Sequence, residues 1–389
     1  MAITVKQVES KKDIETFLHL PWKIYVDANG KRDPNWVPPF LDDQRSLLDP
    51  KKNPFHSHAK TALFSAFNEK GEIVGRISAS ADENFFKQWN EKTGHFGWFE
   101  CVNDSEVAKV LFQEAENFLR KEGVTKVIGP SSFTSNDDYY GFLLKGYDQP
   151  AVMAMTYNPP YYLELAEKCG YTKGKDLYAW WLDATNPFPE RIIKIAEHIK
   201  KKEKLVIRSL DKKKFFEEVM AFKDVYNRAW YANWGAVAMT DEELNYQAKK
   251  LKDIVVPEYI IFAEVDGKTV GACLCAPDIN QVLKTIDGEL FSFHDPFAIL
   301  KFVFGMGWIG GIGKVINRAR LMALGVVPEY RLKGIEAVLY YEIYKAGVSK
   351  GVVGGELSWT LEDNDMINKG IAATGATNYK QYRIYSKKL

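Results

Sequence analysis

The alternation of apolar and polar residues predicts two β-hairpins about half a chain length apart. Residues 61–80, TALFSAFNEKGEIVGRISAS, alternate on both sides of a Lys-Gly turn. Residues 258–276, EYIIFAEVDGKTVGACLCA, alternate in the same way around Asp266-Gly267, a pair typical of two-residue hairpin turns. Because successive side chains point to opposite faces of a strand, each run indicates a strand pair with one face on a core. The similarity of the two runs indicates an internal repeat.

The elements after each hairpin follow the same order. In the first half, a strand over 94–102 precedes a helix over 105–121, in which apolar residues recur every three or four positions. In the second half, a strand over 319–327 precedes a helix over 331–346 that ends at Gly347. Each half then continues with a strand, a helix, a glycine and an aromatic-rich strand. The pattern predicts two copies of one arrangement of helices and strands.

The segment between the two copies, NPFPERIIKIAEHIKKKEK, covers residues 186–204. Its two prolines and its helix, with Ile192, Ile195 and Ile199 on one side, indicate a linker helix packed on a domain. We interpret the lysine run as a solvated face rather than a nucleic-acid site. The predicted organisation is a first domain over 1–185, a linker helix over 186–204 and a second domain over 205–389.

The composition is that of a globular protein. Of 389 residues, 46% are hydrophobic and 26% are charged, which excludes disorder, collagen-like repeats and coiled coil as the main architecture. The net charge of +1 gives no overall attraction to nucleic acid, so we expect no nucleic-acid partner. The N-terminus lacks a signal-peptide pattern, and the four cysteines lack zinc-ligand spacing, although the Cys273/Cys275 pair alone does not exclude a metal. We expect a cytoplasmic protein without a bound metal.

The longest apolar run, FAILKFVFGMGWIGGIG, covers residues 297–313. It contains Lys301 and five glycines and is shorter than the ~20 residues that a spanning helix needs, so a membrane partner is not expected. We interpret it as a buried or partner-covered helix that ends in a glycine-rich loop. Membrane-surface association and a groove for an apolar acyl chain stay open, because basic residues follow at once. Residues 305–310 fit G-x-G-x-x-G but lack the βαβ context of a dinucleotide site.

The sharpest motif is VVPEYRLKG at 326–334. A strand ends at its two valines, Pro328 interrupts the strand pairing, and the residues from Arg331 to Gly334 open a helix. Free backbone N–H groups and the helix dipole make such a start an anion site suited to a pyrophosphate. Gly334 permits close approach of the phosphates, and Arg331 and Lys333 add positive charge. An ordinary helix start with basic residues is the alternative.

A strand, V-x-P and R-x-x-G before a helix resemble the acetyl-CoA-binding element of the GNAT N-acetyltransferase superfamily, written [Q/R]-x-x-G-x-[G/A]. Arg331 and Gly334 match this element, whereas Glu336 stands at its last position. Asn364 after the next strand matches a second element, but Ile371 stands where a tyrosine usually protonates the CoA thiolate. The resemblance implies acetyl-CoA or another acyl-CoA as co-substrate, held by Val326, Val327, Arg331, Leu332, Lys333, Gly334, Ile335 and Asn364.

The resemblance covers most of the chain and includes a largely uncharacterised bacterial GNAT-like family, through segments such as NPFHSHA, YNPPYY and LSWTLEDN. It implies two tandem GNAT-like domains of the α+β class, each with a mixed, mostly antiparallel sheet flanked by helices. The first half lacks the glycine of the motif and carries Asp104 and Glu106, whose carboxylates would repel a pyrophosphate. We therefore interpret the first domain as a degenerate copy that shapes or covers the substrate site.

The superfamily implies acyl transfer from CoA to an amine by direct attack in a ternary complex. Glu356, in the strand after the CoA-binding helix, is the candidate catalytic base, although a carboxylate satisfied by its neighbours fits the same position. Glu100 is its weaker counterpart in the first half, and water, Tyr379 or Tyr382 would protonate the thiolate. We expect acetyl transfer to a small-molecule or peptide amine. A non-catalytic CoA or acyl-ligand binding protein, and a transferase of a longer acyl or aminoacyl group, stay open.

Overall fold

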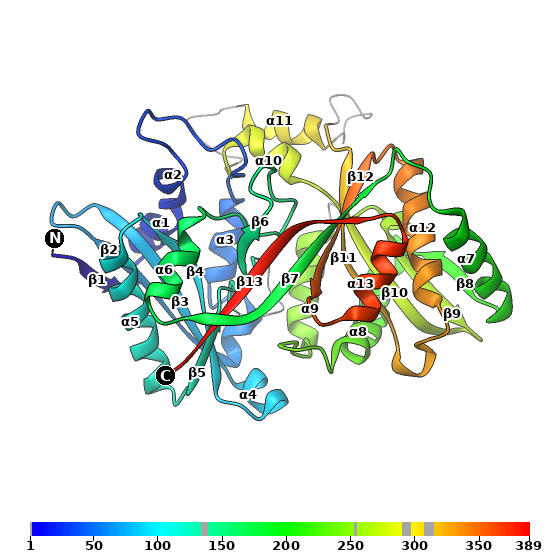
Figure 1. Ribbon diagram of the computed structural model, residues 1–389, viewed down its shortest axis with the longest axis horizontal. Helices are drawn as coiled ribbons and strands as arrows, with labels where there is room; N and C mark the ends of the chain where they lie inside the picture. Colours follow the sequence, from blue (N-terminus) through cyan, green and yellow to red (C-terminus); the bar gives the residue numbers. More distant parts are fainter. Residues whose placement is uncertain (1, 134–138, 253–254, 290–296, 307–314) are drawn as a thin grey trace. The chain divides into compact units, whose positions relative to one another are not determined.

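The computed structural model describes residues 2–389 apart from 134–138, 253–254, 290–296 and 307–314 (Figure 1). Contacts divide the chain into two compact units. The first unit consists of Met1–Leu177, Val282–Phe302 and Gln381–Leu389, and the second consists of Tyr178–Gln281 and Val303–Lys380. Each unit therefore contains chain from both halves of the sequence.

A mixed sheet covered by a long helix forms the centre of the first unit. The strand order is β1-β2-β3-β4-β5, antiparallel except for the parallel pair β4–β5. Helix α5 buries Val107, Leu111 and Ala115 against this sheet, as the apolar spacing predicts. The elements are β1 (Thr4–Gln7), α1 (Lys11–His19), α2 (Pro21–Ile24), α3 (Leu41–Leu48), β2 (Ala59–Phe67), β3 (Ile73–Asp82), α4 (Glu83–Trp89), β4 (Thr93–Cys101), α5 (Ser105–Lys121), β5 (Lys126–Gly129), β6 (Phe142–Lys145) and α6 (Tyr161–Lys168).

The second unit repeats this plan. Its strand order is β8-β9-β10-β11-β12, again antiparallel except for one parallel pair, β11–β12. Helix α12 covers the sheet as α5 does in the first unit, and α7 packs on α12. The elements are α7 (Glu190–Lys202), β8 (Val206–Ser209), α8 (Phe215–Trp230), α9 (Asp241–Leu251), β9 (Ile260–Val265), β10 (Lys268–Pro277), β11 (Arg318–Val326), α12 (Ile335–Ser349), β12 (Gly354–Leu361) and α13 (Asp365–Ala373).

The closing strands of the two halves are exchanged. The end of β13 (Thr377–Lys388) pairs antiparallel with β5 in the first unit, with Tyr385 opposite Gly129. The end of β7 (Thr172–Asp183) neighbours β12 in the second unit, and the Ala184 N–H donates to the Val353 carbonyl at 2.9 Å. Each sheet is therefore completed by the last strand of the other half of the sequence.

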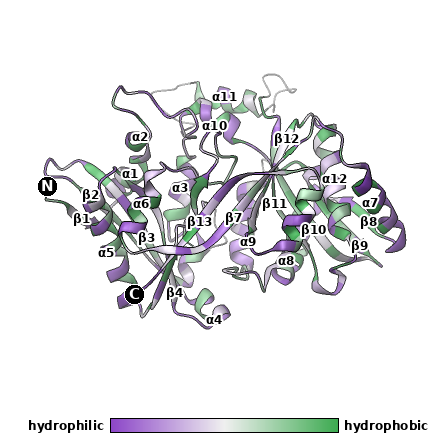
Figure 2. Cartoon of the chain, viewed as in Figure 1, coloured by the Kyte–Doolittle hydropathy of each residue, from purple (hydrophilic) through white to green (hydrophobic). Residues whose placement is uncertain are grey.

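The structure confirms both hairpins and the repeated order of elements, but it moves one helix. Helix α12 begins at Ile335 rather than 331, because a short 3₁₀ turn over Pro328–Tyr330 and the left-handed Gly334 come first. The predicted end at Gly347 is wrong, since the helix continues to Ser349 and Gly347 lies inside it. In the mainly hydrophilic α7 (Figure 2), Ile199 is buried and Ile192 packs on the core, as predicted. Ile195, expected on the same side, is 38% exposed.

The apolar run at 297–313 is described in part. Phe297 is exposed and precedes α11 (Ala298–Gly305), in which Leu300 is also exposed, so the helix is not fully buried. The remainder of the run from 307, including most of the G-x-G-x-x-G sequence, lies outside the described residues. Within the described ranges, no helix combines the length and the apolar character needed to cross a membrane. A second insert helix, α10 (Asn280–Ile286), precedes α11.

Candidate functional site

The parallel strands β11 and β12 separate after a short paired stretch. Arg318 to Leu321 pair with Gly354 to Leu357, and β11 then continues to Val326 and β12 to Leu361 without further pairing between them. The separation starts beside a β-bulge, because Met322 is the extra residue where Leu321 and Ala323 face consecutive residues of β10. A bulge bends its strand and increases its twist. The diverging edges of two strands thus open into a cleft.

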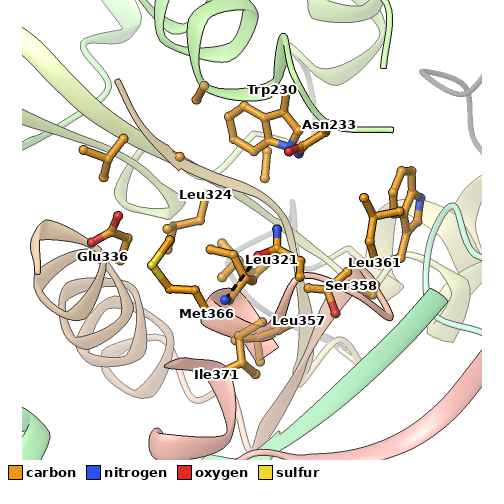
Figure 3. Close-up of a pocket in the computed structure, with 18 of the residues that line it drawn as sticks. Trp230, Asn233, Leu321, Leu324, Glu336, Leu357, Ser358, Leu361, Met366 and Ile371 are labelled. Carbon is orange, nitrogen blue, oxygen red and sulfur yellow. Dashed lines mark hydrogen bonds between the residues drawn. The ribbon is translucent and has the colours of Figure 1, made fainter. Parts of the chain in front are cut away.

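This cleft has a volume of about 340 Å³ (Figure 3). Trp230 and Asn233 lie on one side of it, and Leu357 and Ile371 lie on the other. Its size and its mixture of apolar walls with a few polar groups are those of a site for a small molecule or cofactor. The lining consists of Ala229, Trp230, Asn233, residues 321–326, Arg331, Glu336, Tyr340, residues 357–361, Asn364, Met366, Ile367 and Ile371.

Helix α12 begins beside the cleft, whose lining includes Arg331 and Glu336, and we call this end the mouth of the cleft. Its N-cap is Gly334, with φ of +79°, and no side chain caps the helix there. The first N–H groups of a helix lack partners inside the helix and carry partial positive charge, so this start favours an anion. A Cβ atom at Gly334 would lie 2.5 Å from Cδ1 of Ile199 on α7, so a larger residue would displace this side chain as well as strain the left-handed backbone.

The free edge of β11 supplies backbone donors to the same cleft. The Val327 N–H donates to the Val270 carbonyl of β10 at 2.9 Å. Because backbone N–H groups alternate between the two edges of a strand, the N–H groups of Val326 and Leu324 point to the opposite edge, where β12 has separated. An extended chain in the cleft could therefore pair with β11 as a missing strand does.

Three charged groups stand around the start of α12. Arg331 lines the cleft, and its Nη2 donates to the Ala229 carbonyl at 2.6 Å. Lys333 turns away to Glu203, with 3.0 Å between its Nζ and Oε2 of Glu203. Burial raises the pKa of the Glu336 carboxyl above its usual range, although its own backbone N–H and Arg331 act in the opposite direction. The cleft mouth therefore combines one arginine with one carboxyl group that holds its proton more strongly than usual.

No protein-family model matches the sequence. Two curated relatives align with the chain over nearly its whole length. The chain is 32% identical over 390 residues to Protein YghO of Escherichia coli (strain K12), which covers 99% of this chain and 95% of the relative. It is 31% identical over 395 residues to Bacterial ceramide synthase of Caulobacter vibrioides, which covers 100% of this chain and 98% of the relative. The chain belongs to the family of these two proteins.

Solved structures identify the fold. A GCN5-related glucosamine N-acetyltransferase region of a fungal multi-domain GH3 β-N-acetylglucosaminidase aligns with a TM-score of 0.59 at 15% identity, over 99% of this chain and 38% of that chain. A tandem GNAT protein from the clavulanic acid biosynthesis pathway aligns with a TM-score of 0.53 at 12% identity, over 100% of this chain and 98% of that chain. At these identities the likeness concerns the fold, and it confirms the tandem GNAT-like α+β class.

The predicted CoA-binding residues of this GNAT-like protein fall into three groups. Val326, Arg331 and Asn364 line the cleft. Gly334 and Ile335 form the start of α12 above it, and Val327 directs its N–H to β10. Leu332 is 84% exposed, and Lys333 is paired with Glu203, so neither side chain lines the cleft.

The predicted base, Glu356, lies outside the lining of the cleft. Its side chain is fully buried and accepts hydrogen bonds from the hydroxyl groups of Ser358 and Tyr379. Ser358 does line the cleft, and its Oγ also accepts from Nε of Arg320 at 3.0 Å. Glu356 therefore reaches the cleft through Ser358. Among the described residues, no group of three or more His, Cys, Asp or Glu could hold a metal ion.

Three further residues considered in the sequence analysis, Glu100, Tyr382 and Ile371, do not provide a catalytic group in the cleft. Glu100 in β4 accepts from the Tyr162 hydroxyl at 2.7 Å and lies 3.6 Å from Arg76, and burial raises its pKa. Tyr382 is fully buried in the part of β13 that belongs to the first unit. Ile371, at the expected tyrosine position, is buried in the cleft wall.

Sequence reasoning missed several residues of the cleft. Trp230 and Asn233 come from α8 and the turn after it, nearly a hundred positions before the motif. Tyr340 is the tyrosine of the lining, and burial raises its pKa well above the usual value. Tyr340 lies one helical turn beyond Glu336 on α12. Because residues four positions apart share a face of a helix, this spacing from the motif could have identified Tyr340.

Proposed function

We propose that the second unit binds an acyl-CoA and transfers its acyl group to an amine. The observation that carries this proposal is the cleft between β11 and β12, which opens directly at the uncapped start of α12. The N–H groups at this helix start and Arg331 would hold the pyrophosphate of CoA. The free edge of β11 would pair with the extended arm of CoA, which supports a CoA thioester over other anionic ligands.

The chemistry proposed for this chain is mainly positioning and charge stabilisation. The amine nitrogen attacks the thioester carbon, and the N–H of Val326 stabilises the oxygen that becomes negative. The carbon–sulfur bond then breaks, and CoA leaves as a thiolate. The proton lost by the amine would pass to Ser358 and Glu356, which the hydrogen bond between them already connects. Tyr340, whose raised pKa keeps its hydroxyl protonated, would donate a hydrogen bond that stabilises the leaving thiolate, and water would supply the proton.

The acyl group and the acceptor are proposed from the family. Bacterial ceramide synthase is a family member aligned over the whole chain. A ceramide is the amide of a fatty acid with a long-chain amino alcohol. We therefore propose a fatty acyl-CoA and a long-chain primary amine as substrates, in preference to acetyl-CoA and a peptide. The four cysteines are free thiols, which supports a reaction in the reducing cytoplasm.

Calorimetric titration with acetyl-CoA and hexanoyl-CoA tests the binding step. We expect one molecule bound per chain, because only the second copy of the repeat carries the motif. Release of the CoA thiol in the presence of a long-chain amino alcohol then tests transfer, with Ser358→Ala as the variant expected to lower kcat and leave acyl-CoA affinity unchanged. Binding without thiol release from any of a panel of amines would favour the non-catalytic binding protein. Absence of binding would contradict the proposal.

A further inference from the structure

A second cavity continues the line of the cleft beyond the point where β11 and β12 come together. It has a volume of about 60 Å³ and lies between α12 and the first residues of the two strands. Leu321, Tyr340 and Leu357 line both this cavity and the cleft. These three side chains are therefore the shared wall between the two spaces.

The second cavity is apolar. Phe188, Ile343 and Val348 contribute hydrocarbon to its wall, and burial raises the pKa of the Cys275 thiol that borders it, so this thiol stays neutral. Glu356 also borders the cavity, but its oxygens accept the hydrogen bonds of Ser358 and Tyr379. A small space lined in this way does not attract ordered water, and it favours a hydrocarbon group.

The residues of α12 show in which order the cleft and the second cavity follow along the helix. Gly334 at the helix start marks the mouth of the cleft, Tyr340 lies at the shared wall, and Ile343 and Gly347 lie in the second cavity. Leu321 and Leu357 are the last paired residues of β11 and β12, so the shared wall stands where the two strands meet. A thioester anchored by its phosphates at the helix start would therefore extend its acyl group toward this wall.

We propose that the second cavity, called the acyl pocket from here on, receives the alkyl chain of the acyl-CoA. The inference rests on the proposed function and adds the place of the acyl chain: a pocket for straight-chain acyl groups longer than acetyl. At about 10–15 Å³ of such space for each water-sized group, the acyl pocket takes roughly five carbon atoms. A longer chain would leave near Val348, which is 43% exposed at the rim.

Gly347 offers a way to fill the acyl pocket from the helix. A Cβ atom added there meets Val352, also in the pocket wall, at ordinary contact distances of 3.6–3.9 Å. Gly347→Leu therefore places a side chain where the acyl chain would lie. Gly370→Leu is the matched control, because Gly370 lies in α13, lines neither space and has nothing within 4 Å of an added Cβ.

The experiment is a calorimetric titration of each full-length variant with acetyl-, butyryl- and hexanoyl-CoA. Each buried methylene strengthens binding about fourfold at most, so we expect the wild type to prefer hexanoyl-CoA over acetyl-CoA by at least about tenfold. Gly347→Leu should remove this preference and keep the affinity for acetyl-CoA, whereas Gly370→Leu should keep both. Should the leucine variant fail to fold, Gly347→Ala, which suits a helix better, should shift the preferred chain shorter by about one carbon.

The outcomes test the acyl pocket and the proposed function separately. Binding of all three thioesters with equal affinity in the wild type, or an unchanged hexanoyl preference in Gly347→Leu, overturns the acyl pocket and leaves the proposed function standing. Failure of the wild type to bind any CoA thioester overturns the proposed function, and the acyl pocket falls with it.

Discussion

The two units begin the same helix of the repeat in opposite ways. In the first unit, Asp104 caps α5 with its own carboxylate and accepts the Glu106 N–H at 2.8 Å. In the second unit, the left-handed Gly334 stands at the N-cap of α12, where no side chain caps the helix. The first copy therefore carries its own anion at the position where the second copy can accept one from a ligand.

The two units also differ where their parallel strands separate: the strand edge is covered in the first unit and open in the second. In the first unit, β4 and β5 pair over Thr93–His95, and the Ser131 N–H then donates to the Phe96 carbonyl at 3.0 Å. A Cβ atom at Gly97 would lie 1.4 Å from the Ser131 carbonyl oxygen, so the chain after β5 covers the edge of β4. In the second unit, the corresponding edge borders the cleft.

The aromatic residues show how the first copy is filled. The rings of Phe96 and Phe99 contact Phe112 of α5 at centroid distances of 5.1 and 4.9 Å. In the second unit, Leu321 and Tyr340 stand between the strand and the helix and border two cavities. One fold thus serves in one copy as a packed core and in the other as a candidate binding site.

The largest loss of acyl-CoA affinity is expected when an aromatic side chain fills the cleft of the second unit, as aromatic side chains fill the first unit. Ala323→Trp puts an indole between β11 and β12, where Ala323 lines the cleft. We expect acyl-CoA affinity to fall at least about 100-fold, because the larger side chain takes the space of the ligand. Calorimetric titration measures the loss, and Ala373→Trp on the exposed side of α13 is the control. Unchanged affinity in Ala323→Trp would place the ligand elsewhere.

Removal of the cleft arginine should have a smaller effect. Arg331→Ala deletes a charge-assisted contact with the pyrophosphate, worth about 1.5 kcal/mol or roughly tenfold in affinity. The loss should shrink at high salt, because screening weakens the contribution of an exposed charge. Titration at two ionic strengths measures both effects. Arg191→Ala, an exposed arginine of α7, should behave as the wild type, and an equal loss there would contradict the assignment.

Glu336 should make acyl-CoA binding depend on pH. Burial raises the pKa of its carboxyl, so as the pH falls this group becomes neutral before an ordinary carboxyl does, and repulsion of the pyrophosphate is lost. Affinity should therefore increase several-fold toward acid pH. Glu336→Gln should bind more tightly at neutral pH and lose this part of the pH dependence, whereas the exposed Glu197→Gln should match the wild type. Parallel profiles for the wild type and Glu336→Gln would show that this carboxyl does not face the phosphates.

The smallest effect on binding is expected in the first unit. Asp104→Ala removes the cap of α5 and should lower the free energy of unfolding by about 1 kcal/mol. Acyl-CoA affinity should stay within about twofold of the wild type. Urea denaturation and titration of the same preparation measure the two quantities. A loss of affinity would show that the first copy takes part in binding.

The sequence predicts those features that depend on neighbouring residues. The hairpin at Asp266-Gly267, the amphipathic α5 and the glycine at the start of α12 each follow from a local pattern, and the structure contains all three. Of the residues chosen from the resemblance, Val326, Arg331 and Asn364 line the cleft.

Features that depend on distant pairing could not be predicted. The exchange of β7 and β13 leaves no local signal, because either strand suits either sheet edge by its alternation. The bulge at Met322, which accompanies the strand separation, depends on its register with β10. The sequence predicts Glu356 at the amine. Successive side chains of a strand point to opposite faces, so Leu357 faces the shared wall, and Glu356 bonds to Ser358 and Tyr379 instead.

Hydrogen–deuterium exchange with and without hexanoyl-CoA tests the central claim, that the second copy binds the thioester and the first does not. We predict ligand-dependent protection in peptides covering 322–340 and 357–368, with unchanged exchange in the corresponding peptides 96–110 and 126–133. Protection of the first-unit peptides, or none in the second unit at a saturating ligand concentration, would contradict it.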